Sequence, residues 1–288
     1  MTSRVSFLLR WAEGVLCKNG VDNARCDGEW LLAGALNCGR MELYLARDWM
    51  VAPEARHVFE NFIHRRARRE PLQHILGTVA FGDVELTVDP RALIPRPETE
   101  ELVHAIKDYY MANGISPASI LDLGTGSGAI ILALGKIFPQ ASLAASDLDY
   151  DALSLARANA ERCRMEKSVT FSQSDWFQTL QGTWNLIVSN PPYLSNGELE
   201  SAAPEVRLYE PRHALIAPDD GIGHLKTIIH ESSAFLLPGG LLALETGFSQ
   251  HDYLIHVAGQ AGFTIRKKMH DLSGLPRILL LQRNGPWA

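Results

Sequence analysis

The chain has 288 residues, of which 46% are hydrophobic and 21% are charged. This balance is typical of a globular protein and excludes disorder as the main state of the chain. The length fits one large domain or two smaller ones. Because the net charge is −6, the protein has no overall electrostatic attraction for nucleic acid, and we expect no direct nucleic-acid partner.

The sequence contains no pattern typical of a metal site. None of the four cysteines forms a C-x-x-C pair, and the ten histidines show no ligand arrangement, so we predict no metal. The apolar run near the amino terminus stops at Arg10, too early for a signal peptide. No stretch approaches the roughly 20 apolar residues of a membrane span. We therefore expect a cytoplasmic protein with reduced thiols and no membrane contact.

Residues 1–75 are predicted to form a small helical domain. Apolar residues recur at helical spacing from Val5 to Leu16. Further helices are expected from Trp30 to Ala35, from Met41 to Trp49 and from Pro53 onward.

A run of basic residues, His-Arg-Arg-Ala-Arg-Arg at 64–69, ends the last of these helices. Cations at a helix carboxyl terminus offset the helix dipole, and charge runs are usually solvated. We favour a solvated face over a patch for an acidic partner.

Residues 76–101 are predicted to form a β-hairpin and a linker. From Leu76 to Val88 the apolar residues alternate with period two around Gly82-Asp83, which is typical of a hairpin. Three prolines follow, at positions 90, 95 and 97, and mark the linker.

Residues 102–288 are predicted to form an α/β domain in which strands and helices alternate. Such alternation indicates a mainly parallel, doubly wound sheet with helices on both faces. The last two strands follow each other without a helix, so the sheet should finish antiparallel. The expected strands are Ser119–Leu123, Ala141–Ser146, Val169–Ser172, Asn185–Ser189, Leu241–Glu245, Phe263–Lys267 and Ile278–Gln282.

A glycine-rich motif, Leu-Asp-Leu-Gly-Thr-Gly-Ser-Gly at 121–128, lies where the first of these strands ends and a helix begins. Glycines there permit a tight turn and leave bare backbone against a ligand, and the free N–H groups of the helix start add donors. We predict that this loop binds a nucleotide-like cofactor. The residues concerned are Gly124, Thr125, Gly126, Ser127 and Gly128.

Acidic and aromatic residues follow the next two strands. Asp147 is placed to accept hydrogen bonds from both hydroxyls of a ribose. Asp149 competes for this role, but we expect it to cap the following helix. Asp175 could accept from an adenine amino group, and Trp176 could lie against the ring, although a core position for this indole is the alternative.

The motif Ser-Asn-Pro-Pro-Tyr at 189–193 ends the fourth strand. Its two prolines stiffen the loop and contribute no N–H group. The Asn190 side chain and the Pro191 carbonyl could together accept both hydrogens of a planar –NH2 group. Tyr193 could pack on the flat face of that group, and a purely structural turn is the alternative.

These two motifs together resemble the S-adenosylmethionine-dependent methyltransferases that modify exocyclic or side-chain amide nitrogens. The likeness becomes specific for the HemK-type release factor glutamine methyltransferases over nearly the whole chain. His74 departs from the tyrosine that is more common in this family, and we expect it to pack in the core. The stretches that carry the likeness are Pro71–Gly77, Leu93–Glu100 and Ser174–Phe177.

The resemblance implies a seven-stranded Rossmann-like methyltransferase sheet behind an N-terminal helical domain that recognises the substrate. It implies methyl transfer from S-adenosylmethionine, leaving S-adenosylhomocysteine, to the glutamine N5 of the Gly-Gly-Gln loop of peptide chain release factors, by a monomer. The cofactor would be held by residues 124–128, Asp147, Trp176 and Asn190. The substrate would be held by Asn190, Pro191, Pro192 and Tyr193, of which Asn190, Pro191 and Tyr193 would be catalytic.

Two other substrates share the same local chemistry. A ribosomal-protein glutamine methyltransferase would carry both motifs, but Arg96–Glu100 favours the release factor enzymes. A DNA adenine methyltransferase could bind the –NH2 of adenine in the same way. Against it stand the acidic charge balance and the lack of a basic target-recognition domain.

Overall fold

The computed structural model describes residues 4–271 and 273–285 and divides the chain into two compact units. The helical unit contains Met1–Thr78 together with the short segment Ala203–Tyr209. The sheet unit contains Val79–Ala202 and Glu210–Ala288. The second segment of the helical unit comes from the middle of the chain, and nothing in the sequence pattern indicated it.

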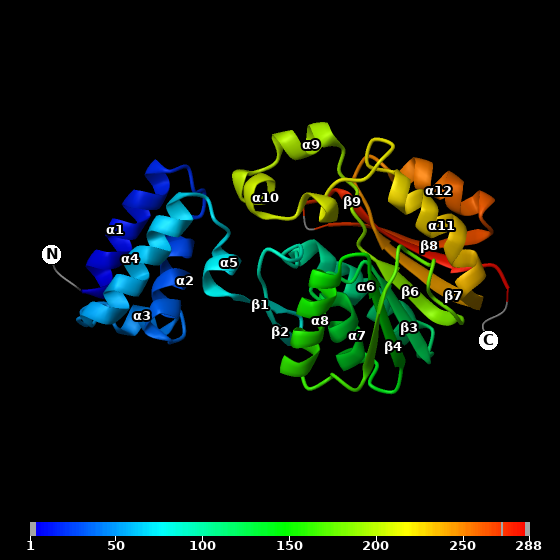
Figure 1. Cartoon of the computed structure of the whole chain (residues 1–288), viewed down its shortest axis with the longest axis horizontal. Coiled ribbons are helices and arrows are strands. Elements are labelled where there is room, and N and C mark those ends of the chain that lie inside the picture. The colour runs from blue at the N-terminus through cyan, green and yellow to red at the C-terminus, as the bar shows by residue number, and fades with distance from the viewer. Residues whose placement is uncertain (1–3, 272, 286–288) are drawn as a thin grey trace. The chain divides into compact units, whose positions relative to one another are not determined.

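The helices within residues 5–76 pack against one another (Figure 1) and enclose an apolar core, to which α10 contributes no residue. The long helix α1 buries Val5, Leu8, Ala12 and Leu16, the stripe that the sequence predicts. The expected helix from Met41 to Trp49 is reduced to the four residues of α3. The helices are α1 (Val5–Lys18), α2 (Ala24–Leu36), α3 (Glu42–Leu45), α4 (Pro53–Ala67), α5 (Leu72–Leu76) and α10 (Pro204–Tyr209).

The basic run at the end of α4 is bound inside the helical unit, so the prediction of a solvated face is wrong for part of it. Arg66 is 7% exposed. Its guanidinium pairs with Asp27 at 2.7 Å and with Glu205 of α10 at 2.8 Å. Arg69 also pairs with Glu205, at 2.7 Å. The acidic partners of these arginines are therefore Asp27 and Glu205 of the chain itself.

The sheet unit begins with the predicted hairpin, β1 (Thr78–Phe81) and β2 (Val84–Thr87). The expected linker does not extend to residue 101, because α6 (Pro97–Ala112) starts at the third proline. Proline at the first helical position loses no hydrogen bond and has a suitable φ. His74, in α5 of the helical unit, is buried as expected.

The seven-stranded sheet has the strand order β5-β4-β3-β6-β7-β9-β8. Its first five strands pair in parallel, and β9 pairs antiparallel with both β7 and β8, as the sequence predicts. The chain order reverses between β3 and β6, a position at which open α/β sheets bind ligands. The strands are β3 (Ser119–Leu123), β4 (Ser142–Asp147), β5 (Val169–Gln173), β6 (Trp184–Ser189), β7 (Leu236–Glu245), β8 (Phe263–His270) and β9 (Pro276–Arg283).

Helices cover both faces of this sheet (Figure 1). Alternate residues of β3 enter opposite cores: Ile120 joins the core under α6 and α7, and Leu121 joins the core under α11 and α12. This period-two division is what a strand buried on both faces requires. The remaining helices are α7 (Ala129–Ile137), α8 (Tyr150–Arg162), α9 (Asn196–Ser201), η1 (Arg212–Ala214), α11 (Gly223–Phe235) and α12 (His251–Gln260).

Candidate active site

The glycine loop turns tightly between β3 and α7. Gly126 and Gly128 have φ angles of 54° and 83°, a region that a side chain makes costly. Thr125 fixes the loop to its neighbours: its hydroxyl donates to Asp122 Oδ2 at 2.6 Å, and its N–H donates to the Ser146 carbonyl at 2.9 Å. The loop is therefore pinned to β3 and β4, and its conformation is set before any ligand arrives.

Asp147, the last residue of β4, faces this loop. Its Oδ2 accepts from the Gly126 N–H at 2.8 Å, and its Oδ1 accepts from the Asp149 N–H at 2.9 Å. Burial raises the pKa of the Asp147 carboxyl, although both hydrogen bonds oppose the rise. A carboxylate offers about four acceptor positions. Two therefore remain for a ligand with two hydroxyl groups.

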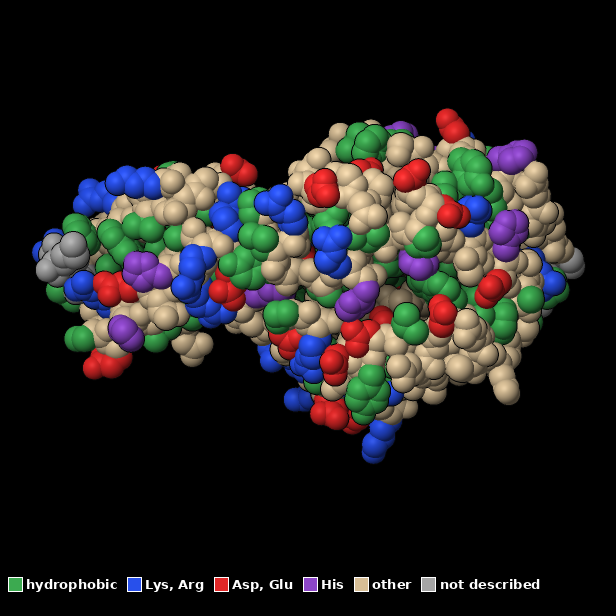
Figure 2. Space-filling view, turned by 45° about the horizontal axis from the view of Figure 1, so that its top comes forward, with side chains coloured by type: hydrophobic (Ala, Val, Ile, Leu, Met, Phe, Trp, Pro, Cys, Tyr) green, Lys and Arg blue, Asp and Glu red, His purple; other side chains and the backbone are tan. Residues whose placement is uncertain are grey.

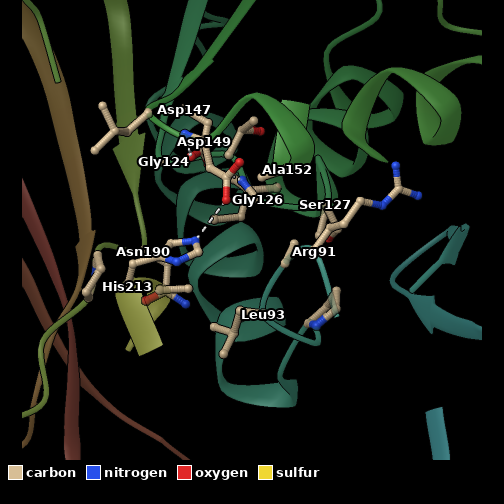
Figure 3. Close-up of a pocket in the computed structure, with 18 of the residues that line it drawn as sticks. Arg91, Leu93, Gly124, Gly126, Ser127, Asp147, Asp149, Ala152, Asn190 and His213 are labelled. Carbon is tan, nitrogen blue, oxygen red and sulfur yellow. Dashed lines mark hydrogen bonds and ion pairs between the residues drawn. The ribbon is translucent and has the colours of Figure 1, made fainter. Parts of the chain in front are cut away.

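Asp149 has the capping role that the sequence predicts, and a second contact besides. Its Oδ1 accepts from the Asp151 N–H at 2.8 Å at the start of α8. Its Oδ2 lies 3.1 Å from His213 Nε2, the pair joined by a dashed line in Figure 3. His213 belongs to η1, which the sequence analysis did not foresee, and no local motif marks it.

Trp176 follows β5 with a φ of 48°, unusual for a bulky side chain. The indole lies tilted against His224 of α11, with ring centroids 5.2 Å apart and ring planes at 55°. The ring also approaches the glycine loop, because a Cβ built on Gly124 would lie 3.6 Å from it. Trp176 packs partly against the apolar core under α11 and α12. The indole therefore lies partly in the core and also lines the cavity, and its contact with an adenine ring stays a prediction.

Asn190 follows β6, and its side chain is tied to α6. Its Nδ2 donates to Thr99 Oγ1 at 3.0 Å. Tyr193 points elsewhere: its hydroxyl donates to Glu245 Oε1 at 3.0 Å, and Arg277 lies over its ring at 5.9 Å. Burial raises the pKa of Tyr193, and the nearby Glu245 raises it further, so the phenol keeps its proton.

A cavity of about 410 Å³ joins these groups (Figure 3). This volume lies within the range of small-molecule sites, about 300–1,000 Å³. Of the residues predicted for the site, Gly128, Pro191 and Tyr193 are not in its lining. The predicted residues that line it are Gly124, Thr125, Gly126, Ser127, Asp147, Trp176, Asn190 and Pro192.

The lining also contains residues to which the sequence analysis assigned no role. Arg91 and Arg96 contribute cations, paired with Asp89 and Glu210 respectively. The stretch Leu93–Glu100 did carry a family likeness, and that signal could have identified Arg96. The others are Ala92, Leu93, Pro95, Thr99, Ala129, Ile130, Leu148, Ala152, Ser174, His213, Ala214 and His224. Asp149 and Asp175, for which the sequence analysis considered a role, also line the cavity.

The cavity has two chemically different ends. The glycine-loop end consists of residues 124–127 with Asp147 and offers mostly backbone groups and a carboxylate. The Asn190 end is lined by the side chains of Asn190 and Thr99, and Glu245 and Tyr193 lie behind them, outside the lining. Within residues 4–271 and 273–285, no cluster of His, Cys, Asp or Glu is arranged to hold a metal. None of the helices within those residues has the length and hydropathy to span a membrane.

Known proteins similar to this chain agree with this architecture. The family model described as PrmC N-terminal domain matches residues 8–77, and the Methyltransferase small domain model matches residues 102–217. The release factor glutamine methyltransferase of Geobacter sulfurreducens is 38% identical over 273 residues, which cover 94% of each chain. That of Deinococcus radiodurans is also 38% identical, covering 96% of this chain and 98% of its own.

The chain belongs to the release factor glutamine methyltransferase family. It is thus a methyltransferase, and the resemblance seen in the sequence is confirmed. More distant solved structures share the fold of the sheet unit. A methyltransferase from Pyrococcus furiosus aligns with a TM-score of 0.52 at 19% identity, covering 77% of this chain and 98% of its own. A 16S rRNA methyltransferase from T. thermophilus, in complex with AdoMet and guanosine, has a TM-score of 0.51 at 18% identity, covering 72% of this chain and 50% of its own.

Proposed function

We propose that this member of the family transfers the methyl group of S-adenosylmethionine to the N5 nitrogen of the glutamine in the Gly-Gly-Gln loop of peptide chain release factors. The observation that carries the proposal is the single cavity that joins Asp147 and the glycine loop to Asn190. Relatives at 38% identity over nearly the whole chain are named release factor glutamine methyltransferase.

The glycine-loop end fits S-adenosylmethionine. Asp147 has two acceptor positions left for the two ribose hydroxyls. Gly126 has no side chain, so the backbone there is open to the cofactor. Trp176 and Asp175 both line the cavity, so an adenine could lie against the indole and donate its amino hydrogens to the carboxylate. When bound, S-adenosylmethionine supplies an electrophilic methyl group that carries its own leaving group.

The Asn190 end suits a planar –NH2 acceptor. A glutamine amide nitrogen is a weak nucleophile because its lone pair is delocalised into the carbonyl. The Asn190 Oδ1 and the Pro191 carbonyl would each accept a hydrogen bond from one N–H of this amide. These hydrogen bonds would stabilise the positive charge that develops on the nitrogen as the methyl group arrives. The stiff loop would hold the nitrogen about 3–3.5 Å from the methyl carbon, in line with its bond to sulfur. No strong base is needed before attack, since the proton can leave afterwards.

Local chemistry at Asn190 does not distinguish glutamine from adenine, so we assign substrate choice to the helical unit. Large hydrophobic side chains lie exposed on it, including Leu45 at 88% and Trp49 at 71%. Figure 2 shows hydrophobic and basic side chains next to one another on the surface of this unit. Exposed apolar groups among charged ones are typical of protein-binding surfaces.

The deciding experiment is mass spectrometry of an intact release factor incubated with this protein and labelled S-adenosylmethionine. We expect one methyl group, on the glutamine of the Gly-Gly-Gln loop, and none after that glutamine is changed to alanine. A ribosomal protein and adenine-containing DNA serve as competing substrates. Labelling of either one with none on the factor would overturn the proposal.

The docking role is tested by Trp49→Ala and Leu45→Ala. We expect each to raise the KM for the intact factor, roughly tenfold as for a buried interface anchor, without changing turnover of an isolated loop peptide. Met111→Ala, equally exposed at 68% but in α6 of the sheet unit, is the matched control. These substitutions are preferable to deletion of residues 1–75, which would also remove Arg66 and Arg69 from Glu205. An unchanged KM in both variants would remove these residues from the docking surface.

A further inference from the structure

A buried chain of hydrogen bonds lies behind Asn190. Thr99, in the first turn of α6, accepts from Asn190 Nδ2 at 3.0 Å and donates its own hydroxyl to Glu245 Oε2 at 2.7 Å. Glu245, the last residue of β7, receives the Tyr193 hydroxyl on its other oxygen at 3.0 Å. Thr99 is 4% exposed and Glu245 is 1% exposed. Three segments distant in sequence therefore meet at one carboxylate.

The chemistry of these groups determines which of them donates and which accepts along this row of hydrogen bonds. An ionised carboxylate can only accept, so the hydroxyls of Thr99 and Tyr193 must both donate to Glu245. The Thr99 hydroxyl has a single hydrogen, so toward Asn190 it can only accept. The amide of Asn190 must then present its nitrogen to Thr99. Its oxygen lies at the opposite end of the amide.

Several neighbouring groups shift the pKa of the Glu245 carboxyl. Burial raises the pKa of its carboxyl, and the Glu98 charge adds to this rise. The hydrogen bonds from Thr99 and Tyr193 and the charge of Arg277 oppose it. Arg277 is held in turn by Asp271, whose Oδ2 lies 3.0 Å from its Nε. Burial is the largest of these influences, and the pKa stays above its usual value. The direction of the hydrogen-bond chain therefore rests on the geometry, in which the hydroxyls of Thr99 and Tyr193 both donate to Glu245.

We propose that Thr99 and Glu245 are positioning residues that hold the Asn190 amide with Oδ1 available to the –NH2 of the methyl acceptor. This inference rests on the proposed function. A reversed amide would present its own –NH2 to the acceptor's –NH2, and two donors cannot form a hydrogen bond. Glu245 thus determines which end of the Asn190 amide meets the substrate, without touching the substrate itself.

The test compares Thr99→Val, which removes the hydroxyl at nearly constant volume, with Thr99→Ser, which keeps it. We expect Thr99→Val to lower kcat on an intact release factor about tenfold, the effect of one lost buried hydrogen bond. The Kd for S-adenosylmethionine, measured by calorimetry, should stay within about twofold. Thr99→Ser should recover most of the turnover. Glu245→Gln, which introduces an –NH2 where two acceptors are needed, should resemble Thr99→Val.

A double-mutant cycle separates positioning from a general packing defect. If Thr99 acts through Asn190, Thr99→Val should cost nothing further in an Asn190→Ala background. An equal loss of kcat in both backgrounds would overturn the proposal, and so would wild-type turnover by Thr99→Val.

A second measurement needs no acceptor substrate. The side-chain ¹⁵N–¹H₂ signals of Asn190, identified by their loss in Asn190→Ala, should be protected from hydrogen exchange in the wild type and in Thr99→Ser. They should lose that protection in Thr99→Val. If the wild type methylates no release factor, the proposed function fails, yet these signals still decide whether Thr99 holds the amide. Equal protection in Thr99→Val and the wild type would reject the positioning role.

Discussion

The two ends of the cavity are built in different ways. At the glycine-loop end, Asp147 binds the N–H of Gly126, which is 21 residues away, and the groups that a ligand would meet are largely backbone. At the Asn190 end, Asn190 reaches Thr99 across 91 residues, and Thr99 reaches Glu245 across 146. A site made of backbone depends on one local turn, whereas a site made of side chains depends on the whole sheet.

This difference separates binding from turnover. Changes at the glycine-loop end should act on cofactor affinity, because the groups there hold a ligand that stays in place during the reaction. Changes at the Asn190 end should act on the rate of transfer, because the groups there meet the nitrogen whose charge changes. Substitutions at the two ends therefore test whether one end controls cofactor affinity and the other controls the rate of methyl transfer.

The largest effect is expected from Asn190→Ala. Loss of the side-chain acceptor should lower kcat on the intact release factor on the order of 10²–10³-fold, by analogy with removal of one donor from an oxyanion hole. The cofactor Kd, measured by calorimetry, should change little. Asn196→Ala, on the exposed first residue of α9, is the matched control. Near-normal turnover of Asn190→Ala at saturating substrate would contradict the role of this end.

A smaller effect, on cofactor affinity and not on turnover, is expected from Asp147→Ala. Loss of charge-assisted hydrogen bonds to a ribose should cost about 1.5–3 kcal/mol of cofactor binding, while the protein stays folded. The control is Asp149→Asn, because asparagine still caps α8 and only the charge beside His213 is lost. Calorimetry should show a much weaker Kd for the first variant than for the second. Equal affinities would remove Asp147 from the cofactor site.

The same difference explains what the sequence could predict. The positions of the glycine loop, Asp147 and the cap at Asp149 could be predicted, because a strand, a turn and a helix that are adjacent in sequence determine them. Glu245 was expected as the end of a strand, but its partner Thr99 is brought to it only by the packing of α6 on the sheet. His213 likewise reaches Asp149 from a short 3₁₀ helix that no periodicity marks.

Charge partners show the same limit. The basic run at the end of α4 looked solvated because its acidic partner, Glu205, lies more than 130 residues away in the sequence. Burial raises the pKa of the Glu205 carboxyl, but the hydrogen bonds from Arg69 and Arg66 outweigh burial and help to lower the pKa to about 2. The sequence shows which residues are charged, but it does not show which charged residues pair in the folded protein.

The smallest effect concerns Asp122, at the end of β3, whose carboxyl binds the hydroxyl of Thr125 in the glycine loop. Burial raises the pKa of its carboxyl from 3.8 to about 7, against the hydrogen bond from Thr125. Between these values the folded state binds a proton that the unfolded state has lost, so the free energy of unfolding falls as the pH rises. Asp122→Asn cannot titrate, and the cofactor-free wild type should therefore lose about 1 kcal/mol relative to this variant between pH 6 and pH 7. Urea unfolding at the two pH values measures that change, with the exposed Asp252→Asn as the control. If the stability difference between wild type and Asp122→Asn were the same at both pH values, the carboxyl would already be ionised, and the glycine-loop end would rest on a buried charge.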